Sequence, residues 1–282
     1  MIAILEVIVL GIVEGITEWL PVSSTGHMLL VYKLFGINEA EPFWSLFLVV
    51  IQFGAILAVV VMFWNKLWPF HRVHPEEKGV YKVISRPKLV MWVKIISSCL
   101  PAVNVAMPHD NWIEAHFYNY VCVAIMLILW GVLFIVVENR NKGKQAEVRK
   151  ISEISWQLAL IIGIFQLLAG LFPGTSRSGA TILGGIMFGM SRKCASEYTF
   201  FLAVPVMLGA SVLKFVKFNG SFTAAQWGYL ILGMALAFLV SVCAIRFLMG
   251  YIRKHDFKAF GWYRIVLGII VLASFGIPAL LA

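Results

Sequence analysis

Apolar residues run through most of this chain in long blocks, which short polar segments separate. Six of these blocks are long enough to cross a bilayer as helices, because a spanning helix needs roughly 17 to 25 mostly apolar residues. The pattern therefore predicts six membrane-spanning helices. They lie at about residues 44–64, 90–107, 120–137, 199–217, 228–249 and 262–281.

Two further segments, residues 1–36 and 154–190, are apolar, but each is interrupted by a short polar stretch that contains a proline. We call these stretches the polar knots; the first covers residues 14–27 and the second residues 173–179. Pro21 breaks the first segment and Pro173 breaks the second, which leaves pieces too short to cross a bilayer. Short broken pieces of this kind are typical of re-entrant helix-loop-helix hairpins. We therefore expect two re-entrant hairpins besides the six spans.

The same order occurs twice: a hairpin followed by three spans, in repeat one at about residues 1–140 and in repeat two at about 152–282. An internal echo supports a duplication, because Trp19–Ser24 resembles Leu171–Ser176 at one constant offset. Three spans per half is an odd number, so the second half must be inverted relative to the first. The prediction is an all-α polytopic membrane protein with an inverted-topology repeat, folded as a single integral membrane domain over residues 1–282.

The composition agrees, since 61% of the 282 residues are hydrophobic whereas soluble domains are nearer half apolar. Residues 1–13 hold no basic cluster, and we expect no cleaved signal peptide. The four cysteines are scattered and are interpreted as packing residues rather than disulfide or zinc ligands. Basic residues fall between the apolar blocks, so the net charge of +9 indicates membrane topology and no nucleic-acid partner.

The basic loops predict the orientation of the chain. Under the six-span arrangement they share one face, which the positive-inside rule places in the cytoplasm. Both termini are then outside, the first hairpin enters from outside and the second from inside, and their tips meet near the midplane. The basic residues on this face are Lys66, Arg72, Lys78, Lys82, Arg86, Lys88, Arg140, Lys142, Lys144, Arg149, Lys150, Arg192, Lys193, Arg253, Lys254 and Lys258.

The first polar knot holds two acids, Glu14 and Glu18, which share a helix face because they are four residues apart. Two carboxylates on one face repel each other unless a divalent metal, a shared proton or a cation such as Arg177 lies between them. The alternative interpretation places both acids on the wet side of a surface helix. Each charged group near the membrane centre costs roughly 2.5–3.5 kcal/mol, which favours a working cavity.

Hydroxyl groups follow the acids in the same knot, from Ser23, Ser24 and Thr25. They lie on a turn that leads into a helix expected from Met28, and backbone N–H groups at such a helix start suit an anion such as phosphate. A simple helix cap is the alternative. His27 is a candidate general acid or base, or it binds the loop backbone.

The second knot is richer in donors, with Thr175, Ser176, Ser178 and the guanidinium of Arg177. The planar guanidinium can donate two parallel hydrogen bonds to two phosphate oxygens, and it stays charged at any relevant pH. The helix expected from about Ala180 adds positive potential at its start. The alternative is a structural ion pair between the arginine and one of the two acids.

Other polar residues lie within or beside the predicted spans. We expect Lys94, Lys214 and Arg246 to extend toward the membrane interfaces, and Arg264 to anchor the start of the last span. We expect the remaining three to contact the two polar knots. They are Gln52, Gln166 and Glu197.

Several motifs resemble the undecaprenyl-diphosphate phosphatase family, the BacA-type bacitracin-resistance proteins of bacteria. The resemblance covers nearly the whole chain. The motifs are Glu14-Gly-x-Thr-Glu18-x-Leu-Pro-Val-Ser-Ser-Thr-Gly-His27, Pro173-Gly-x-Ser-Arg-Ser-Gly-Ala-Thr181, Ser196-Glu-x-x-Phe-x-Leu-Ala-Val-Pro205 and Val50-Ile-Gln-x-Gly54.

The resemblance implies an integral membrane phosphatase of the bacterial inner membrane that converts undecaprenyl diphosphate to undecaprenyl phosphate and inorganic phosphate. It thereby recycles the lipid carrier of peptidoglycan synthesis and confers bacitracin resistance. The resemblance also implies an active site that opens to the outer face, a divalent cation such as Mg²⁺ or Ca²⁺, and a possible homodimer. On this interpretation the donors of both knots hold the diphosphate.

Two catalytic routes fit these residues. Glu18, with or without Glu14, binds the metal or activates water, or His27 activates Ser24 as a covalent nucleophile. A transporter or flippase of polyprenyl phosphate is the alternative function, because inverted repeats and broken helices are typical of transporters. Two acids in an anion site disfavour pure transport. The other lipid-phosphatase class is rejected because no His-x3-Asp follows Arg177.

Overall fold

The computed structural model describes residues 2–38, 41–70, 83–218 and 222–281. Within these ranges the protein is helical and contains no β-strand, only two isolated bridges. Six helical segments are long and apolar enough to cross a membrane, so the six predicted spans are confirmed. They cover Pro42–Met62, Arg86–His109, Tyr120–Arg140, Arg192–Val216, Ala224–Tyr251 and Lys258–Gly276.

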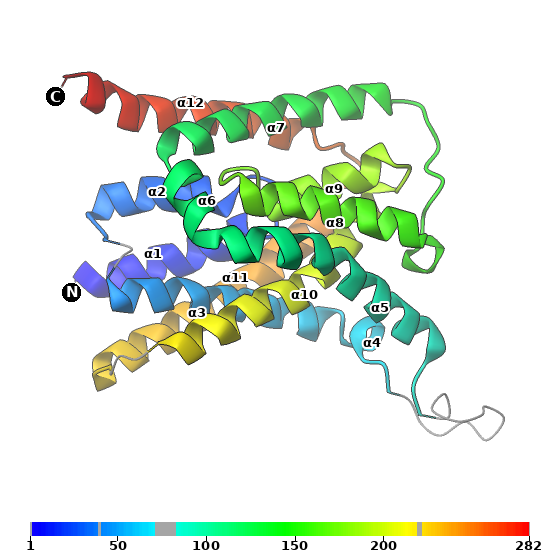
Figure 1. Ribbon diagram of the computed structural model, residues 1–282, viewed down its shortest axis with the longest axis horizontal. Helices are drawn as coiled ribbons and strands as arrows, with labels where there is room; N and C mark the ends of the chain where they lie inside the picture. Colours follow the sequence, from blue (N-terminus) through cyan, green and yellow to red (C-terminus); the bar gives the residue numbers. More distant parts are fainter. Residues whose placement is uncertain (1, 39–40, 71–82, 219–221, 282) are drawn as a thin grey trace.

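Both polar knots lie at the tips of helical hairpins, as predicted. The first hairpin consists of α1 (Ile2–Thr17) and α2 (Ser24–Phe35), and the second of α8 (Trp156–Leu171) and α9 (Arg177–Met187). They point in from opposite ends of the molecule, and the tips meet in its middle (Figure 1). The helices after the tips begin about one turn earlier than predicted, so hydroxyls and the arginine occupy first turns rather than loops.

Local sequence signals set the ends of the long helices. Asn119 Oδ1 accepts a hydrogen bond from the backbone N–H of Cys122 at 2.9 Å, and Thr223 forms a capping box with Gln226. Pro101 lacks an N–H donor, and the regular helix gives way there to a π-helical turn. The remaining elements are α3 (Pro42–Met62), α4 (Trp64–Leu67), α5 (Arg86–Pro101), η2 (Ala102–Ala106), η3 (Met107–His109), α6 (Asp110–Phe117), α7 (Tyr120–Arg140), η4 (Ile151–Glu153), α10 (Arg192–Lys217), α11 (Ala224–Tyr251) and α12 (Lys258–Leu281).

Helices of one half pack between and against helices of the other half, so the two halves do not form separate bundles. The last spans of the halves, α7 and α12, pack together, and each hairpin packs on the second span of the opposite half, α8 on α5 and α1 on α11. Between α7 and α12 the backbones come so close that a Cβ on Gly131 would lie 2.7 Å from the carbonyl oxygen of Gly261. These matched pairings support the predicted repeat, whose inverted symmetry and boundaries stay a prediction.

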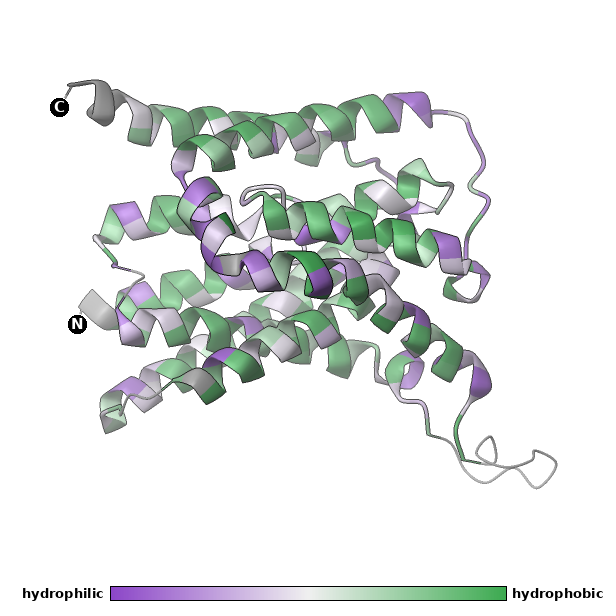
Figure 2. Ribbon diagram, in the orientation of Figure 1, coloured by the Kyte–Doolittle hydropathy of each residue, from purple (hydrophilic) through white to green (hydrophobic). Residues whose placement is uncertain are grey.

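The two ends of the bundle differ in charge. Both termini lie at one end, whereas α4, the start of α5 and the basic segment 141–155 lie at the other, here called the basic end (Figure 1). Hydrophilic residues gather at the ends and near the hairpin tips, while the long helices are mostly hydrophobic (Figure 2). Arg72, Lys78 and Lys82 lie outside the described residues. At this end the buried Glu138 carboxylate accepts from the Arg192 guanidinium at 2.9 Å.

Candidate active site

A small polar cavity of about 210 Å³ lies where the two hairpin tips meet. Its volume suits an ionic head group rather than a long chain, because pockets for drug-sized ligands hold about 300–1,000 Å³. Both hairpins line it, together with α3 and α10. The lining residues are Glu18, Ser24, Thr25, Gln52, Ala169, Pro173, Gly174, Ser176, Arg177, Ser178 and Met207.

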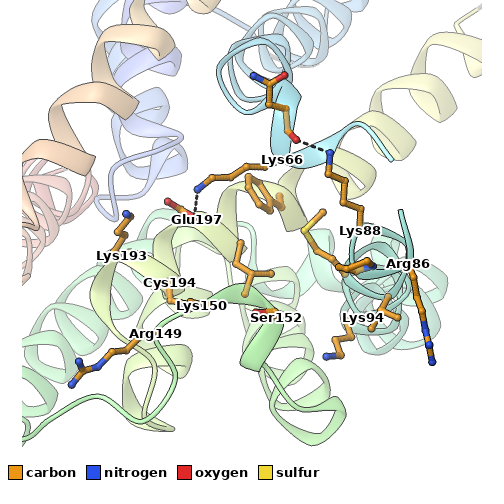
Figure 3. Close-up of a pocket in the computed structure, with 16 residues that line it drawn as sticks. Lys66, Arg86, Lys88, Lys94, Arg149, Lys150, Ser152, Lys193, Cys194 and Glu197 are labelled. Carbon is orange, nitrogen blue, oxygen red and sulfur yellow. Dashed lines mark hydrogen bonds and ion pairs between the residues drawn. The ribbon is translucent and has the colours of Figure 1, made fainter. Parts of the chain in front are cut away.

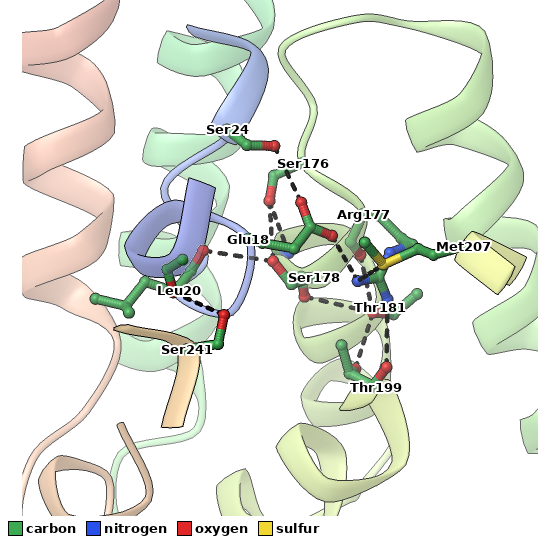
Figure 4. A network of polar contacts seen from close by, with 12 residues as sticks. Glu18, Leu20, Ser24, Ser176, Arg177, Ser178, Thr181, Thr199, Met207 and Ser241 are labelled. Atoms are coloured by element: carbon green, nitrogen blue, oxygen red, sulfur yellow. Dashed lines mark hydrogen bonds and ion pairs between the residues drawn. The ribbon is translucent and has the colours of Figure 1, made fainter. Parts of the chain in front are cut away.

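Glu18 is the centre of the polar contacts at this cavity (Figure 4). One carboxylate oxygen accepts from the Arg177 guanidinium at 2.8 Å, and the other accepts from the Ser24 hydroxyl at 3.1 Å. The glutamate and arginine side chains are only 10% and 14% exposed. A guanidinium from the second hairpin and a carboxylate from the first therefore converge at one small cavity, as the sequence predicted.

Two serines with left-handed backbones start the helices that face the cavity. Ser23 precedes α2 with φ 72°, and Ser176 precedes α9 with φ 69°; they are the two non-glycine residues with positive φ in the described part of the chain. Such strain costs about 1–3 kcal/mol and concentrates at functional sites. The shared backbone conformation makes Ser176 the equivalent of Ser23. The predicted echo paired Ser23 with Thr175 instead, so the two alignments differ by one residue. By the shared backbone conformation, Arg177 occupies the position of Ser24.

Both helix starts direct their first backbone N–H groups toward the tip region, which favours an anion there. Ser176 Oγ accepts from the backbone N–H of Gly179 at 3.1 Å and lies 3.2 Å from the Ser178 hydroxyl. Ser178 Oγ also lies 3.4 Å from the Leu20 carbonyl oxygen of the first hairpin. The second knot therefore combines helix capping with donors that line the cavity. The ion pair that was the alternative interpretation of this knot is also present, between Arg177 and Glu18.

Arg264 holds the two tips together, and the expectation that it anchors a membrane interface was wrong. Its side chain is fully buried and donates to the carbonyl oxygens of Pro21 at 3.3 Å, Gly174 at 2.9 Å and Thr175 at 2.8 Å. The guanidinium thus bridges the first hairpin to the second. A single arginine within an apolar span was the available signal, since buried charge needs several partners.

Gly174 lets the second tip approach α7 closely. Its φ of 91° is left-handed, and a Cβ there would lie 2.5 Å from the carbonyl oxygen of Val123. Both observations restrict the position to glycine. The polar tip is thereby pressed against a transmembrane helix and places its hydroxyls beside the first hairpin.

Four of the predicted site residues do not line the cavity: Glu14, Ser23, His27 and Thr175. The imidazole Nδ1 lies 2.7 Å from the Ser23 carbonyl oxygen, which can only accept, so Nδ1 donates. Nε2 then accepts from the Tyr263 hydroxyl at 2.7 Å. His27 thus binds the loop backbone, the second of its two predicted roles, and forms no contact with Ser24.

Three predictions about other polar residues have different outcomes. Gln52 lines the cavity, as expected. Glu197 instead forms an ion pair with Lys66 at 2.8 Å, at the basic end, so its expected contact with the knots was wrong. Lys94 is buried and donates to the Ile154 carbonyl oxygen at 2.6 Å in the cavity of the basic end, so its side chain extends toward that end of the bundle, as expected. The correction for Glu197 arises because a neighbouring helix supplies a partner that a single helix lacks.

The acids offer a limited set of metal ligands. Within the described ranges, no group of three or more His, Cys, Asp or Glu side chains is placed to hold a metal ion. Glu14 is buried one turn before Glu18, and its Oε1 has no hydrogen-bond partner. Mg²⁺ commonly uses one or two carboxylates together with substrate phosphates and water. Glu14 and Glu18 are two carboxylates of the kind that such a cation would use.

Comparison with known proteins agrees with this geometry. Residues 7–270 match the family described as bacitracin resistance protein BacA. The chain belongs to this family.

Relatives match along almost their full length. The chain is 57% identical over 274 residues to undecaprenyl-diphosphatase 1 of Clostridium acetobutylicum, covering 97% of this chain and 98% of that protein. It is 55% identical over 275 residues to the undecaprenyl-diphosphatase of Desulfitobacterium hafniense, covering 98% and 97%. It is 56% identical over 271 residues to an undecaprenyl-diphosphatase of Enterococcus faecalis, covering 96% of both.

Proposed function

We propose that this multi-pass membrane protein is a phosphatase that hydrolyses undecaprenyl diphosphate to undecaprenyl phosphate and inorganic phosphate. One observation carries the proposal: a carboxylate, a hydroxyl, a guanidinium and two helix N-termini surround one buried cavity of about 210 Å³. The family and the names of its relatives support the same activity. No relative described above has a name that indicates transport.

The diphosphate head carries most of the charge that the site must neutralise. We assign that task to Arg177, Ser176, Ser178 and the backbone N–H groups at the starts of α2 and α9. The leaving group is itself a phosphate monoester, so it departs without a strong acid. Catalysis then depends mainly on positioned positive charge and on a positioned nucleophile.

Glu18 is the proposed base. Its carboxylate oxygen lies 3.1 Å from the Ser24 hydroxyl. In one route Glu18 takes the Ser24 proton, Oγ bonds to the terminal phosphorus as the bridging P–O bond breaks, and water later hydrolyses the phosphoserine. In the other, Glu18 takes a proton from water, which attacks the same phosphorus directly. Since His27 binds Ser23 and Tyr263, Glu18 replaces it as the base of the covalent route and stays the base of the water route.

We propose that Glu14 and Glu18 would hold a divalent cation, Mg²⁺ or Ca²⁺. Its support is the buried Glu14 Oε1, which lacks a partner, and the demand of both cations for oxygen ligands. When bound, the cation would neutralise phosphate charge.

Phosphate release from a short prenyl diphosphate, by the protein in detergent, tests the function. We expect Arg177→Ala to lower kcat roughly 100- to 1000-fold, the usual loss for one transition-state donor, and Glu18→Gln to do the same. Arg246→Ala removes an exposed arginine from α11 and serves as the matched control. Unchanged turnover in Arg177→Ala would refute the site.

Two further measurements separate the routes and test the cation. Acid quenching with ³²P-labelled substrate should trap phosphoserine only in the covalent route, and Ser24→Ala should then abolish turnover. If Ser24→Ala costs only a few-fold, activated water is correct. Chelation should abolish activity and added Mg²⁺ or Ca²⁺ should restore it, and chelator-resistant turnover would exclude the cation.

We also propose that the protein resides in the bacterial inner membrane with its basic end in the cytoplasm. The proposal that the active site opens to the outer face comes from the family resemblance. A membrane-impermeant thiol reagent should label a cysteine at Asn111 in intact cells and not one at Lys144, in a background with Cys122 and Cys243 replaced by serine. The reverse labelling would show the opposite orientation. A homodimer remains a proposal from the resemblance, testable by light scattering in detergent.

A further inference from the structure

A cavity near the basic end lies apart from the hairpin tips and plays no part in the proposed chemistry. It holds about 660 Å³ and is enclosed by four segments: α4, the start of α5, the residues before and within η4, and the start of α10 (Figure 3). Seven cationic side chains line it, from Lys66, Arg86, Lys88, Lys94, Arg149, Lys150 and Lys193.

The positive charge of this cavity is compensated by few acids. Glu197 is the one carboxylate in the lining and pairs with Lys66 at 2.8 Å. Glu153, in η4, is the other acid nearby; its carboxylate accepts from the backbone N–H groups of Arg149 and Lys150, which lowers its pKa. Within the described part of the chain, six cations, counted without Arg86, against these two acids leave the cavity positive.

Several of these cations are held in place by neutral partners. Lys88 donates to the carbonyl oxygens of Asn65 and Trp68 at 2.7 and 2.8 Å, and Lys94 donates to that of Ile154 at 2.6 Å. Carbonyl partners position an ammonium group without cancelling its charge. The starts of α5 and α10 add positive potential at the same place.

An apolar cavity of about 490 Å³ lies on the same three helices, α4, α5 and α10, and residues adjacent in the chain line the two cavities: Lys66 and Leu67 on α4, and Lys88 and Leu89 on α5. Trp64, Trp68, Phe70 and Trp92 lie along it, and the first two stack with ring centroids 4.5 Å apart. Tryptophans of this kind concentrate at the level of lipid head groups. A cationic chamber beside an apolar one matches a molecule with an anionic head and a hydrocarbon chain.

We propose that the basic end holds a second binding site, for the phosphate head group of an anionic membrane lipid. The phosphate occupies the cationic cavity and the first part of a hydrocarbon chain occupies the apolar cavity. This site is separate from the tip cavity and does not depend on the hydrolytic function. A free phosphate compound would satisfy the charges as well, but would leave the apolar chamber unused.

Binding of dioleoyl phosphatidic acid to the purified protein, measured by native mass spectrometry and by the lipid-induced rise in Tm, tests the proposal. Among the described residues, neither Lys150 nor Lys193 forms an ion pair, so the double variant K150Q/K193Q removes charge without breaking one. We expect roughly 30-fold weaker lipid binding with unchanged phosphatase activity. The matched control R253Q/K254Q removes two exposed charges from the turn between α11 and α12 and should bind lipid as the wild type does.

Three further comparisons test the lipid specificity, the role of the apolar cavity and the location of the site. Glycerol 3-phosphate should bind much more weakly than the lipid, and equal affinities would make this a site for soluble phosphates. Trp68→Ala should weaken lipid binding and leave glycerol 3-phosphate binding unchanged. An equal loss in K150Q/K193Q and R253Q/K254Q would show general surface attraction and overturn the site.

Discussion

Replacement of Arg264 by lysine tests how the two hairpin tips are kept in register. The guanidinium is fully buried and donates to three carbonyl oxygens, those of Pro21 on the first tip and of Gly174 and Thr175 on the second. Lysine keeps the positive charge but places its donors at a single point, so it cannot reproduce a fork that reaches both tips. We expect the longest of the three bonds, to Pro21, to be lost.

The size of the effect follows from that lost bond. A buried carbonyl oxygen that loses its donor costs about 1–3 kcal/mol. If the tips separate to relieve this cost, Glu18 and Arg177 lose their alignment and the whole penalty falls on the transition state. Since about 1.4 kcal/mol is a tenfold change in rate, kcat/KM should fall roughly 5- to 150-fold.

Steady-state phosphate release in detergent, together with Tm, is the assay. A positioning role predicts that kcat falls more than KM rises, because alignment matters most in the transition state. Arg246→Lys, on the exposed side of α11, is the matched control and should change neither. Wild-type kcat/KM in Arg264→Lys at an unchanged Tm would refute the bridging role.

Three further predictions concern the frame around the site. Glu138→Gln should lower the free energy of unfolding by about 1–3 kcal/mol in denaturant titrations, because an amide N–H₂ at this buried position would face the Arg192 donors, while the 37% exposure of the arginine limits the loss; a change under about 0.5 kcal/mol would contradict this. Gly174→Ala should reduce activity at least tenfold, since its Cβ would collide with a backbone carbonyl oxygen of α7, and full activity would disprove that close approach. His27→Ala should reduce kcat, and His27→Asn should restore most of it if the imidazole only donates to Ser23, whereas general acid–base catalysis would leave both variants 100-fold or more impaired.

Most of the architecture could be predicted from the pattern of apolar blocks. The six spans and the two hairpins follow from block length and from Pro21 and Pro173, because a bilayer imposes a fixed length on each helix. The meeting of Glu18 and Arg177 was also predicted, from the cost of burying opposite charges apart. The helix starts were placed a turn late, because the left-handed backbones of Ser23 and Ser176 leave no mark in residue type.

The sequence alone determined that acids, hydroxyls and a guanidinium gather in two knots, since such groups are costly in lipid and belong together. Only the tertiary structure decided which partner each group takes. Arg264 bridges both tips, Glu18 rather than His27 contacts Ser24, and Glu197 pairs with Lys66 at the far end of the bundle. These partners lie on helices far apart in the chain, and only the packing of the helices determines which side chains come within hydrogen-bonding distance.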